Sequence, residues 1–151
     1  MTPIEFVTES LRIEGIYTPP EDRHIKEFER FMKLKSVQLY DLYQFVYVYE
    51  PGAVLRDQYG LDVIIGNYRP PRGSHLIKEW LMNLLDSKMS AYEKHIAYEM
   101  LHPFTDCNGR SGRMLWAHAM GRRAALQRGF LHTFYYQCLS KEQSNDNTRP
   151  V

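Results

Sequence analysis

The chain has 151 residues, with 19 lysine and arginine side chains against 18 aspartate and glutamate side chains, so its formal net charge is +1. A content of 44% hydrophobic and 25% charged residues excludes a wholly disordered chain, and the length suits one domain with a sizeable core. We find no basic stripe that would bind nucleic acid and no apolar run that would span a membrane. The two cysteines cannot form a disulfide framework, so we expect a reducing compartment and, by default, the cytoplasm.

The first third of the chain predicts three helices. The run Thr2-Pro3-Ile4-Glu5 has the form of a capping box, and Gly15 ends the helix that it starts. A second helix is expected over 20–33, where apolar residues recur at helical spacing. A third is expected over 37–49, although tyrosine and valine are frequent there.

Glycines and prolines interrupt residues 51–73. Within them, Val63-Ile64-Ile65 followed by Gly66-Asn67 predicts one arm of a short β-hairpin.

Helical periodicity returns in the second half of the chain. We expect a helix over 74–87, another from the capping box of Ser90 and Glu93 to Leu101, and a third from Arg110 to about Gln127. A last helix is expected over 130–140, before a polar, disordered tail over 142–151. With no internal repeat and no long linker, the prediction is an all-α single domain with one small hairpin.

The stretch from His102 to Arg113, HPFTDCNGRSGR, is the most informative part of the sequence. Its loop opens onto the N-terminus of a helix, where unpaired N–H groups and the helix dipole favour an anion. Asn108 and Gly109 readily adopt left-handed conformations, which lets successive amides curl into a nest. Arg110 lies three residues before Arg113, so both should share a helix face. These features predict a polyphosphate site.

Two further side chains of this stretch bring chemistry to that site. Asp106 could hold a Mg²⁺ ion that bridges phosphate oxygens, and His102 can accept a proton near neutral pH. Taken singly, these residues suit a turn, a surface charge and a helix cap, but the set predicts phosphate-ester chemistry with a divalent metal. A zinc site of His102, Asp106 and Cys107 is the weaker alternative, because no fourth ligand has suitable spacing.

The same residues resemble the signature of the Fic family, H-P-F-x-[D/E]-G-N-G-R-x-x-R. The run His95-Ile-Ala-Tyr-Glu99, Arg56, and the stretches Ile64–Gly66 and Pro70-Pro71 also resemble the family core, so the similarity covers about residues 36–127. Membership implies a Fic-type helical bundle with a β-hairpin flap. It also implies transfer of AMP from ATP to a Ser, Thr or Tyr hydroxyl of a target protein.

The resemblance also implies a role for each motif residue. His102 would deprotonate the target hydroxyl, Asp106 would bind Mg²⁺ at the α- and β-phosphates, and Phe104 would anchor the loop in the core. The nucleotide phosphates would be met by Asn108, Gly109, Arg110 and, at the γ-phosphate, Arg113.

One motif position departs from the family. Cys107 stands where the family usually has glycine. If that position needs a positive φ, its Cβ is disfavoured, and we expect the cost to fall on catalysis rather than on the fold.

The first predicted helix carries a second resemblance. The run from Ser10 to Gly15, SLRIEG, is similar to the inhibitory motif [S/T]-x-x-x-E-[G/N] of many Fic proteins. Ser10 and Glu14 lie at i and i+4 and face the same way. The resemblance implies that Glu14 pairs with Arg113 in the place of the γ-phosphate and turns the α-phosphate away from in-line attack. The plain alternative is a solvated glutamate at a helix end that Gly15 caps.

These expectations divide the single domain into an inhibitory helix over 1–18, a Fic core over 19–141 and the tail over 142–151. Within the core, residues 62–73 correspond to the flap, where an extended target segment would pair with Val63, Ile64, Ile65 and Gly66. A plain surface hairpin is the alternative.

The leading prediction is a Mg²⁺-dependent protein adenylyltransferase, with ATP as substrate, that its first helix inhibits and whose target protein could be the chain itself. Two alternatives stay open. One is removal of AMP, with Glu14 positioning a water molecule. The other is a nucleotide-binding regulatory module whose chemistry Cys107 has weakened.

Overall fold

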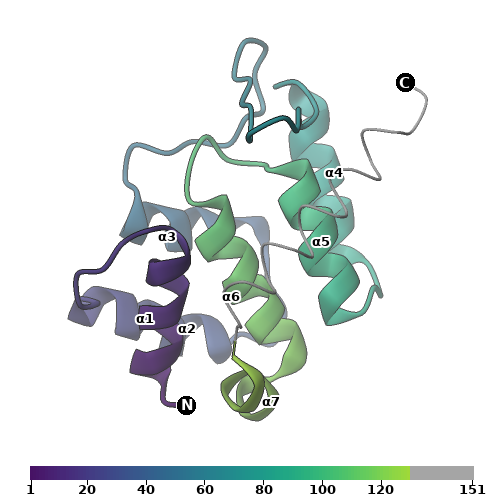
Figure 1. Cartoon of the computed structure of the whole chain (residues 1–151). Coiled ribbons are helices and arrows are strands. Elements are labelled where there is room, and N and C mark those ends of the chain that lie inside the picture. The colour runs from purple at the N-terminus through teal and green to yellow at the C-terminus, as the bar shows by residue number, and fades with distance from the viewer. Residues whose placement is uncertain (130–151) are drawn as a thin grey trace.

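The computed structural model describes residues 1–129, and these residues form an all-α structure (Figure 1). Its helices are α1 (Pro3–Ile13), α2 (Asp22–Met32), α3 (Leu39–Tyr49), α4 (His75–Asp86), α5 (Ala91–Leu101), α6 (Asn108–Met120) and α7 (Arg122–Arg128). The helix expected over 130–140 and the tail over 142–151 lie outside the described residues. Within 1–129, the helices are too short or too polar to cross a bilayer.

Helix α6 lies at the centre of the arrangement. It contacts α5 most extensively and also packs against α1, α2, α3 and α7 (Figure 1). Gly112 permits the close approach of α5, because a Cβ there would collide with the side chains of Tyr98 and Glu99. Met114 and Ala117, farther along α6, are buried in the apolar core. The helix that follows the candidate loop is therefore held on several sides.

The predicted capping boxes are both present. The Thr2 N–H donates to Glu5 Oε2 at 2.6 Å, and Thr2 Oγ1 accepts from the Glu5 N–H at 3.2 Å. Ser90 and Glu93 make the same reciprocal pair at the start of α5.

The single helix expected from Arg110 to Gln127 is wrong. Gly121 interrupts it with φ 86° and ψ 147°, a conformation that side-chain-bearing residues rarely adopt, and α7 starts after it. Helix α6 also begins two residues earlier than expected, at Asn108, because the left-handed Cys107 already serves as its N-cap.

The expected β-hairpin is not formed among the described residues. Ile65 and Tyr68 exchange two backbone hydrogen bonds of 2.9 and 2.8 Å around Gly66, but this is an isolated bridge without strands. Extending the ladder would need an N–H from Pro70, which has none. Tyr68 is also drawn into the core, where its hydroxyl donates to the Met100 carbonyl at 2.7 Å. The flap is thus a tight turn with irregular arms.

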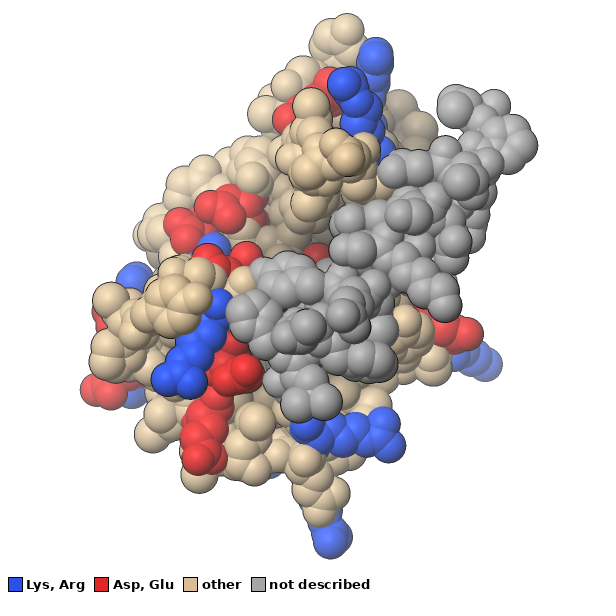
Figure 2. Space-filling view, viewed as in Figure 1, with Lys and Arg blue, Asp and Glu red and all other residues tan. Residues whose placement is uncertain are grey.

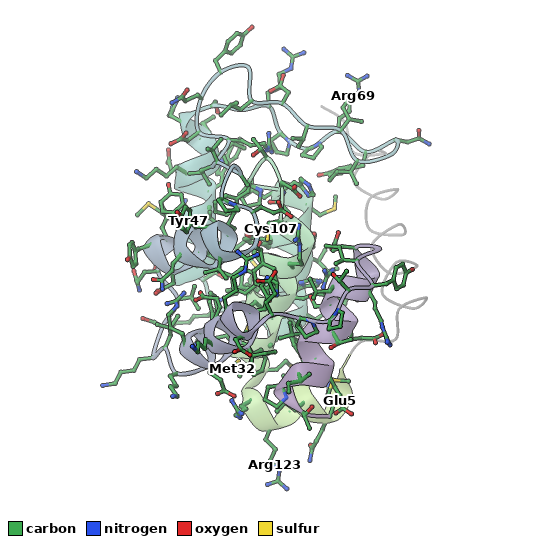
Figure 3. All side chains as sticks on the ribbon, turned by 90° about the vertical axis from the view of Figure 1, so that its left-hand side faces the viewer. Glu5, Met32, Tyr47, Arg69, Cys107 and Arg123 are labelled. Carbon is green, nitrogen blue, oxygen red and sulfur yellow. The ribbon has the colours of Figure 1, made fainter. Side chains whose placement is uncertain are left out.

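The charged side chains form no continuous basic stripe on the face shown in Figure 2, where acidic side chains lie between lysines and arginines. Figure 3, turned by 90°, shows Cys107 well inside the molecule and Arg69 projecting from one end. Cys107 is accordingly buried and Arg69 exposed.

Candidate functional site

The loop between α5 and α6 has a shape that its own residues fix. It leaves α5 at His102, with φ 50° and ψ 62°, and enters α6 at Cys107, with φ 69° and ψ 15°. Between them, the Phe104 N–H donates to Asn108 Oδ1 and Asn108 Nδ2 donates to the Phe104 carbonyl, both at 2.8 Å. The Asn108 side chain is therefore occupied within the loop, and it can serve an anion only through its backbone N–H.

Residues 54–56 brace the loop from outside. The Arg56 N–H donates to the Pro103 carbonyl at 2.8 Å, and the Thr105 N–H donates to the Val54 carbonyl at 2.9 Å. Phe104 is 1% exposed and packs in the core, where it anchors the loop as expected.

The first turn of α6 presents open hydrogen-bond donors. Within residues 1–129, no hydrogen bond is made by the N–H groups of Asn108, Gly109 and Arg110, whereas the Ser111 N–H donates to the Cys107 carbonyl at 3.0 Å. Three consecutive N–H groups at the positive end of a helix dipole form a site that favours an anion. The open donors that the nest prediction needs are therefore present, but their predicted origin is wrong: Asn108 and Gly109 are helical, and the left-handed residue is Cys107, directly before them.

A carboxylate from α1 reaches this nest. Glu14 Oε1 lies 2.5 Å from Arg113 Nη2 and also lies against Gly109, where an added Cβ would collide with it. Arg113 Nε donates to Ser10 Oγ at 2.8 Å, and Nη2 donates to the Ser10 carbonyl at 2.9 Å. The predicted contact between Glu14 and Arg113 is thus confirmed, and Ser10 takes part in it.

The end of α1 explains how Glu14 reaches that position. Gly15 adopts φ 73°, and the N–H groups of Gly15 and Ile16 donate to the carbonyls of Arg12 and Leu11. This pattern ends the helix at Ile13, leaves Glu14 as its C-cap and turns the chain away. Glycine therefore does cap α1, as the plain alternative required, but the glutamate before it is paired rather than solvated.

Arg110 and Arg113 have different partners. Arg110 is 6% exposed; its Nη1 lies 3.0 Å from Glu50 Oε1 and its Nη2 lies 3.6 Å from Asp106 Oδ1. Its guanidinium also lies 5.7 Å from the ring centre of Tyr49. The two arginines of α6 are therefore held by different partners, Arg110 by Glu50 and Asp106, and Arg113 by Ser10 and Glu14.

His102 is neutral at pH 7. Burial lowers the pKa of its imidazole to about 4, the Glu99 backbone opposes this, and the positive charge of Arg56 adds to it. Nδ1 is buried and makes no hydrogen bond within the described chain. A proton on Nδ1 leaves Nε2 as the nitrogen that can accept a proton from a substrate.

Arg56 is a positioning residue that the sequence resemblance marked without giving it a role. It is 0% exposed, and its Nε and Nη2 donate to the carbonyls of His102 and Leu101 at 2.7 and 2.9 Å. Its Nη1 donates to Leu61 and Pro71, so one guanidinium ties the loop to both ends of the flap segment. Burial lowers the pKa of Arg56. No periodicity in the sequence indicates that Arg56 braces the loop; its burial and its hydrogen bonds show it.

The Asp106 carboxylate is largely exposed. Its side chain is 63% exposed, and Oδ1 accepts the Cys107 N–H at 2.6 Å. Oδ2 makes no hydrogen bond with another residue of the described chain, so it is free for a cation. A single exposed carboxylate beside a phosphate nest suits Mg²⁺, which is usually held by one or two carboxylates, phosphates and water.

The zinc alternative receives no support. Among residues 1–129, no group of three or more His, Cys, Asp or Glu side chains is arranged to hold a metal. Burial raises the pKa of the Cys107 thiol to about 12, which keeps it protonated and a poor ligand. The other cysteine, Cys138, lies outside the described residues.

The flap residues are partly or largely exposed: Val63 and Ile65 are half-buried, and Gly66 is exposed. Ile64 is 62% exposed, whereas Ile65 pairs with Tyr68. The segment that contains Val63, Ile64, Ile65 and Gly66 is held to the loop through Arg56 at both of its ends.

The chain was compared with models of known protein families, and none matches. The resemblance to the Fic family therefore stays a prediction that depends on the motif and on the geometry around it.

Proposed function

We propose that the chain is a Mg²⁺-dependent protein adenylyltransferase that its own α1 holds inactive. The observation that carries this proposal is the position of Glu14. Its carboxylate lies at the N-terminus of α6, bonded to Arg113 and directly over Gly109.

That position is one that an anion should occupy. Three open N–H groups and the helix dipole attract negative charge, and Arg113 is 1% exposed, so its guanidinium needs a nearby anion. Glu14 supplies the anion in the nucleotide-free chain. A γ-phosphate offers the same charge and the same hydrogen-bond geometry to a guanidinium, so the two compete.

His102 would act as the base of the transfer. The target hydroxyl oxygen forms a bond to the α-phosphorus, and the bond from that phosphorus to the bridging oxygen breaks, which releases pyrophosphate. The hydroxyl proton goes to His102 Nε2. Burial favours this role, since it keeps the imidazole unprotonated before the reaction, although a pKa of about 4 also makes it a weak base until substrate is bound.

Asp106 is the residue that would hold the metal, through its free Oδ2. When bound, Mg²⁺ supplies charge neutralisation at the phosphates. Arg110 would also neutralise charge at the phosphates once Asp106 turns toward the metal. Glu50 would then still hold the Arg110 guanidinium in place.

Removal of AMP is the second candidate, and one observation favours it. Burial lowers the pKa of His102, and the negative charge of Glu14 is one of the influences that oppose this, so the carboxylate lies close enough to affect the imidazole. A water molecule between the two would be oriented for attack on a phosphodiester.

The experiment is incubation of the chain and of Glu14→Gly with Mg²⁺ and ATP labelled at its α-phosphate. Labelling of protein by Glu14→Gly and not by the parent supports autoinhibited transfer. Release of AMP from a modified target by the parent supports removal, and saturable ATP binding without either reaction supports the regulatory module.

A further inference from the structure

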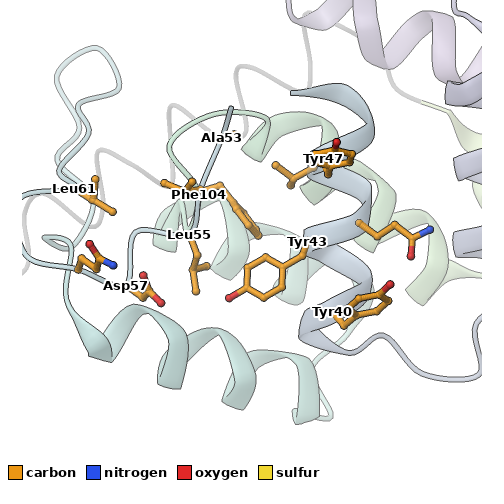
Figure 4. Close-up of a pocket in the computed structure, with 12 residues that line it drawn as sticks. Tyr40, Tyr43, Tyr47, Ala53, Leu55, Asp57, Leu61 and Phe104 are labelled. Atoms are coloured by element: carbon orange, nitrogen blue, oxygen red, sulfur yellow. The ribbon is translucent and has the colours of Figure 1, made fainter. Parts of the chain in front are cut away.

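A groove lined by tyrosines lies between α3 and residues 53–61, and Phe104 of the loop also lines it (Figure 4). Its volume is about 740 Å³, which is within the range of ligand-binding pockets. Helix α3 supplies one wall and residues 53–61 supply the other. The lining residues are Tyr40, Tyr43, Gln44, Val46, Tyr47, Ala53, Val54, Leu55, Asp57, Gln58, Leu61 and Phe104.

Among the tyrosines of α3, Tyr40 and Tyr47 lie at the rim of the groove and Tyr43 lies on its floor. Tyr40 and Tyr47 are 70% and 67% exposed, whereas Tyr43 is 38% exposed and points toward Leu55 (Figure 4). The ring of Tyr43 meets that of Phe104 edge-to-face, with centres 6.0 Å apart. Nothing in the fold of the described chain requires these rings to be exposed. Large, exposed aromatic rings beside an apolar floor are typical of a binding surface.

The residues that line the groove carry negative charge and no positive charge. Asp57 is the only charged residue among those that line it, and none of them is lysine or arginine. Burial raises the pKa of the Tyr43 phenol, and the Asp57 carboxylate is near enough to add to this shift. An occupant should therefore carry positive charge at the Asp57 end.

We propose that this groove binds an extended proline-rich segment of a partner protein that carries an arginine or lysine beside its prolines. In a polyproline II helix one turn of three residues rises about 9.3 Å, close to the roughly 10.5 Å of helix axis between Tyr40 and Tyr47. Proline rings pack on aromatic rings, and the Tyr hydroxyls can donate to backbone carbonyls that such a helix leaves unpaired. An α-helical partner has no such free carbonyls, so the exposed phenols favour the extended form.

The test uses the full chain and a fluorescent peptide of three Pro-Pro-Ala repeats followed by arginine, with fluorescence anisotropy as the readout. A second peptide carries the arginine at the other end, and a third replaces it with glutamate. We expect saturable binding that Tyr47→Ala and Tyr40→Ala each weaken by about tenfold. Both side chains are exposed, so circular dichroism should show that these variants remain folded.

Two controls separate the groove from other sites. Tyr17→Ala removes an equally exposed tyrosine, 76%, between α1 and α2, and should leave binding unchanged. Asp57→Asn should abolish the preference for arginine over glutamate in the peptide. The proposal is overturned by absence of saturable binding or by binding that Tyr17→Ala weakens as much as Tyr47→Ala does. It is equally overturned by tighter binding of an amphipathic helical peptide, or by self-association of the chain that Tyr47→Ala abolishes.

Discussion

The change from Glu14 to glycine should convert a poorly active chain into an active one. Glu14→Gly removes the carboxylate that lies 2.5 Å from Arg113 Nη2 and vacates the space over Gly109. Arg113 keeps both of its hydrogen bonds to Ser10, so its guanidinium stays in place for a γ-phosphate.

The size of the effect follows from the strength of the contact that is lost. A hydrogen bond to a charged group contributes about 1.5–3 kcal/mol, and the 31% exposed Glu14 side chain places this pair below a fully buried one. If that energy holds ATP in a pose unsuited to in-line attack, its removal raises the population of the productive pose about 10- to 150-fold. The affinity for ATP should rise less, because ATP binds in both poses.

The assay is the initial rate of label transfer at saturating ATP and Mg²⁺. Arg12→Gly is the matched control, since it places glycine in the same last turn of α1 at an exposed side chain and should leave the rate at the parent value. Glu14→Gln should give an intermediate rate because it keeps the shape but not the charge. Arg113→Ala in the Glu14→Gly background should cancel the gain. A Glu14→Gly rate equal to that of the parent would refute inhibition by α1.

Three further predictions concern the loop itself. Because the unfolded His102 is protonated near pH 6.5 and the folded one only near pH 4, the unfolded state binds more protons between these values. The chain should then lose about 2 kcal/mol of unfolding free energy between pH 7 and pH 5 that His102→Asn retains, as urea titrations at both pH values can measure. Cys107→Gly should be about 1 kcal/mol more stable to urea than Cys107→Ala, since φ 69° disfavours a Cβ. Arg56→Met should cost at least about 3 kcal/mol in the same measurement because it leaves four carbonyls unpaired, one in a buried and three in partly buried positions, whereas the exposed Arg69→Met should change stability by less than about 0.5 kcal/mol.

Each of these has a contrary outcome. Identical pH dependence in the parent and in His102→Asn would mean that burial does not shift this imidazole. Greater stability of Cys107→Ala than of Cys107→Gly would mean that the left-handed conformation is not strained. Equal stability of Arg56→Met and Arg69→Met would mean that the guanidinium does not hold the loop.

The sequence predicted those parts of the structure that local chemistry determines. The capping boxes at Thr2 and Ser90 formed because their hydrogen bonds are made within one turn. The motif position of Cys107 normally holds glycine, so the sequence alone raised the question of a positive φ there, and the structure has one. Pairing of Glu14 with Arg113, 99 residues apart, was available only from the resemblance, since spacing within one helix says nothing about a contact between two.

Other features depend on contacts that no sequence pattern encodes. The hairpin does not form because Pro70 has no N–H to donate and because Tyr68 is buried in the core. Neither effect can be seen in the apolar residue pattern from which the hairpin was predicted. The helix expected from Arg110 to Gln127 runs through Gly121, and only the φ of 86° at this glycine shows the break. The role of Arg56 follows from its burial and its hydrogen bonds. Arg110 and Arg113 have different partners because Glu50 lies near one guanidinium and Ser10 lies near the other.

Adenylyl transfer is tested most directly by the intact mass of Glu14→Gly after incubation with ATP and Mg²⁺, with a target protein or alone. We expect a gain equal to one AMP on the chain or on its target. We also expect no such gain with Glu14→Gly carrying His102→Ala, a variant that should still bind ATP because the nest, Asp106 and both arginines remain. An unchanged mass for Glu14→Gly and every target offered, with ATP bound at saturation, would contradict adenylyl transfer.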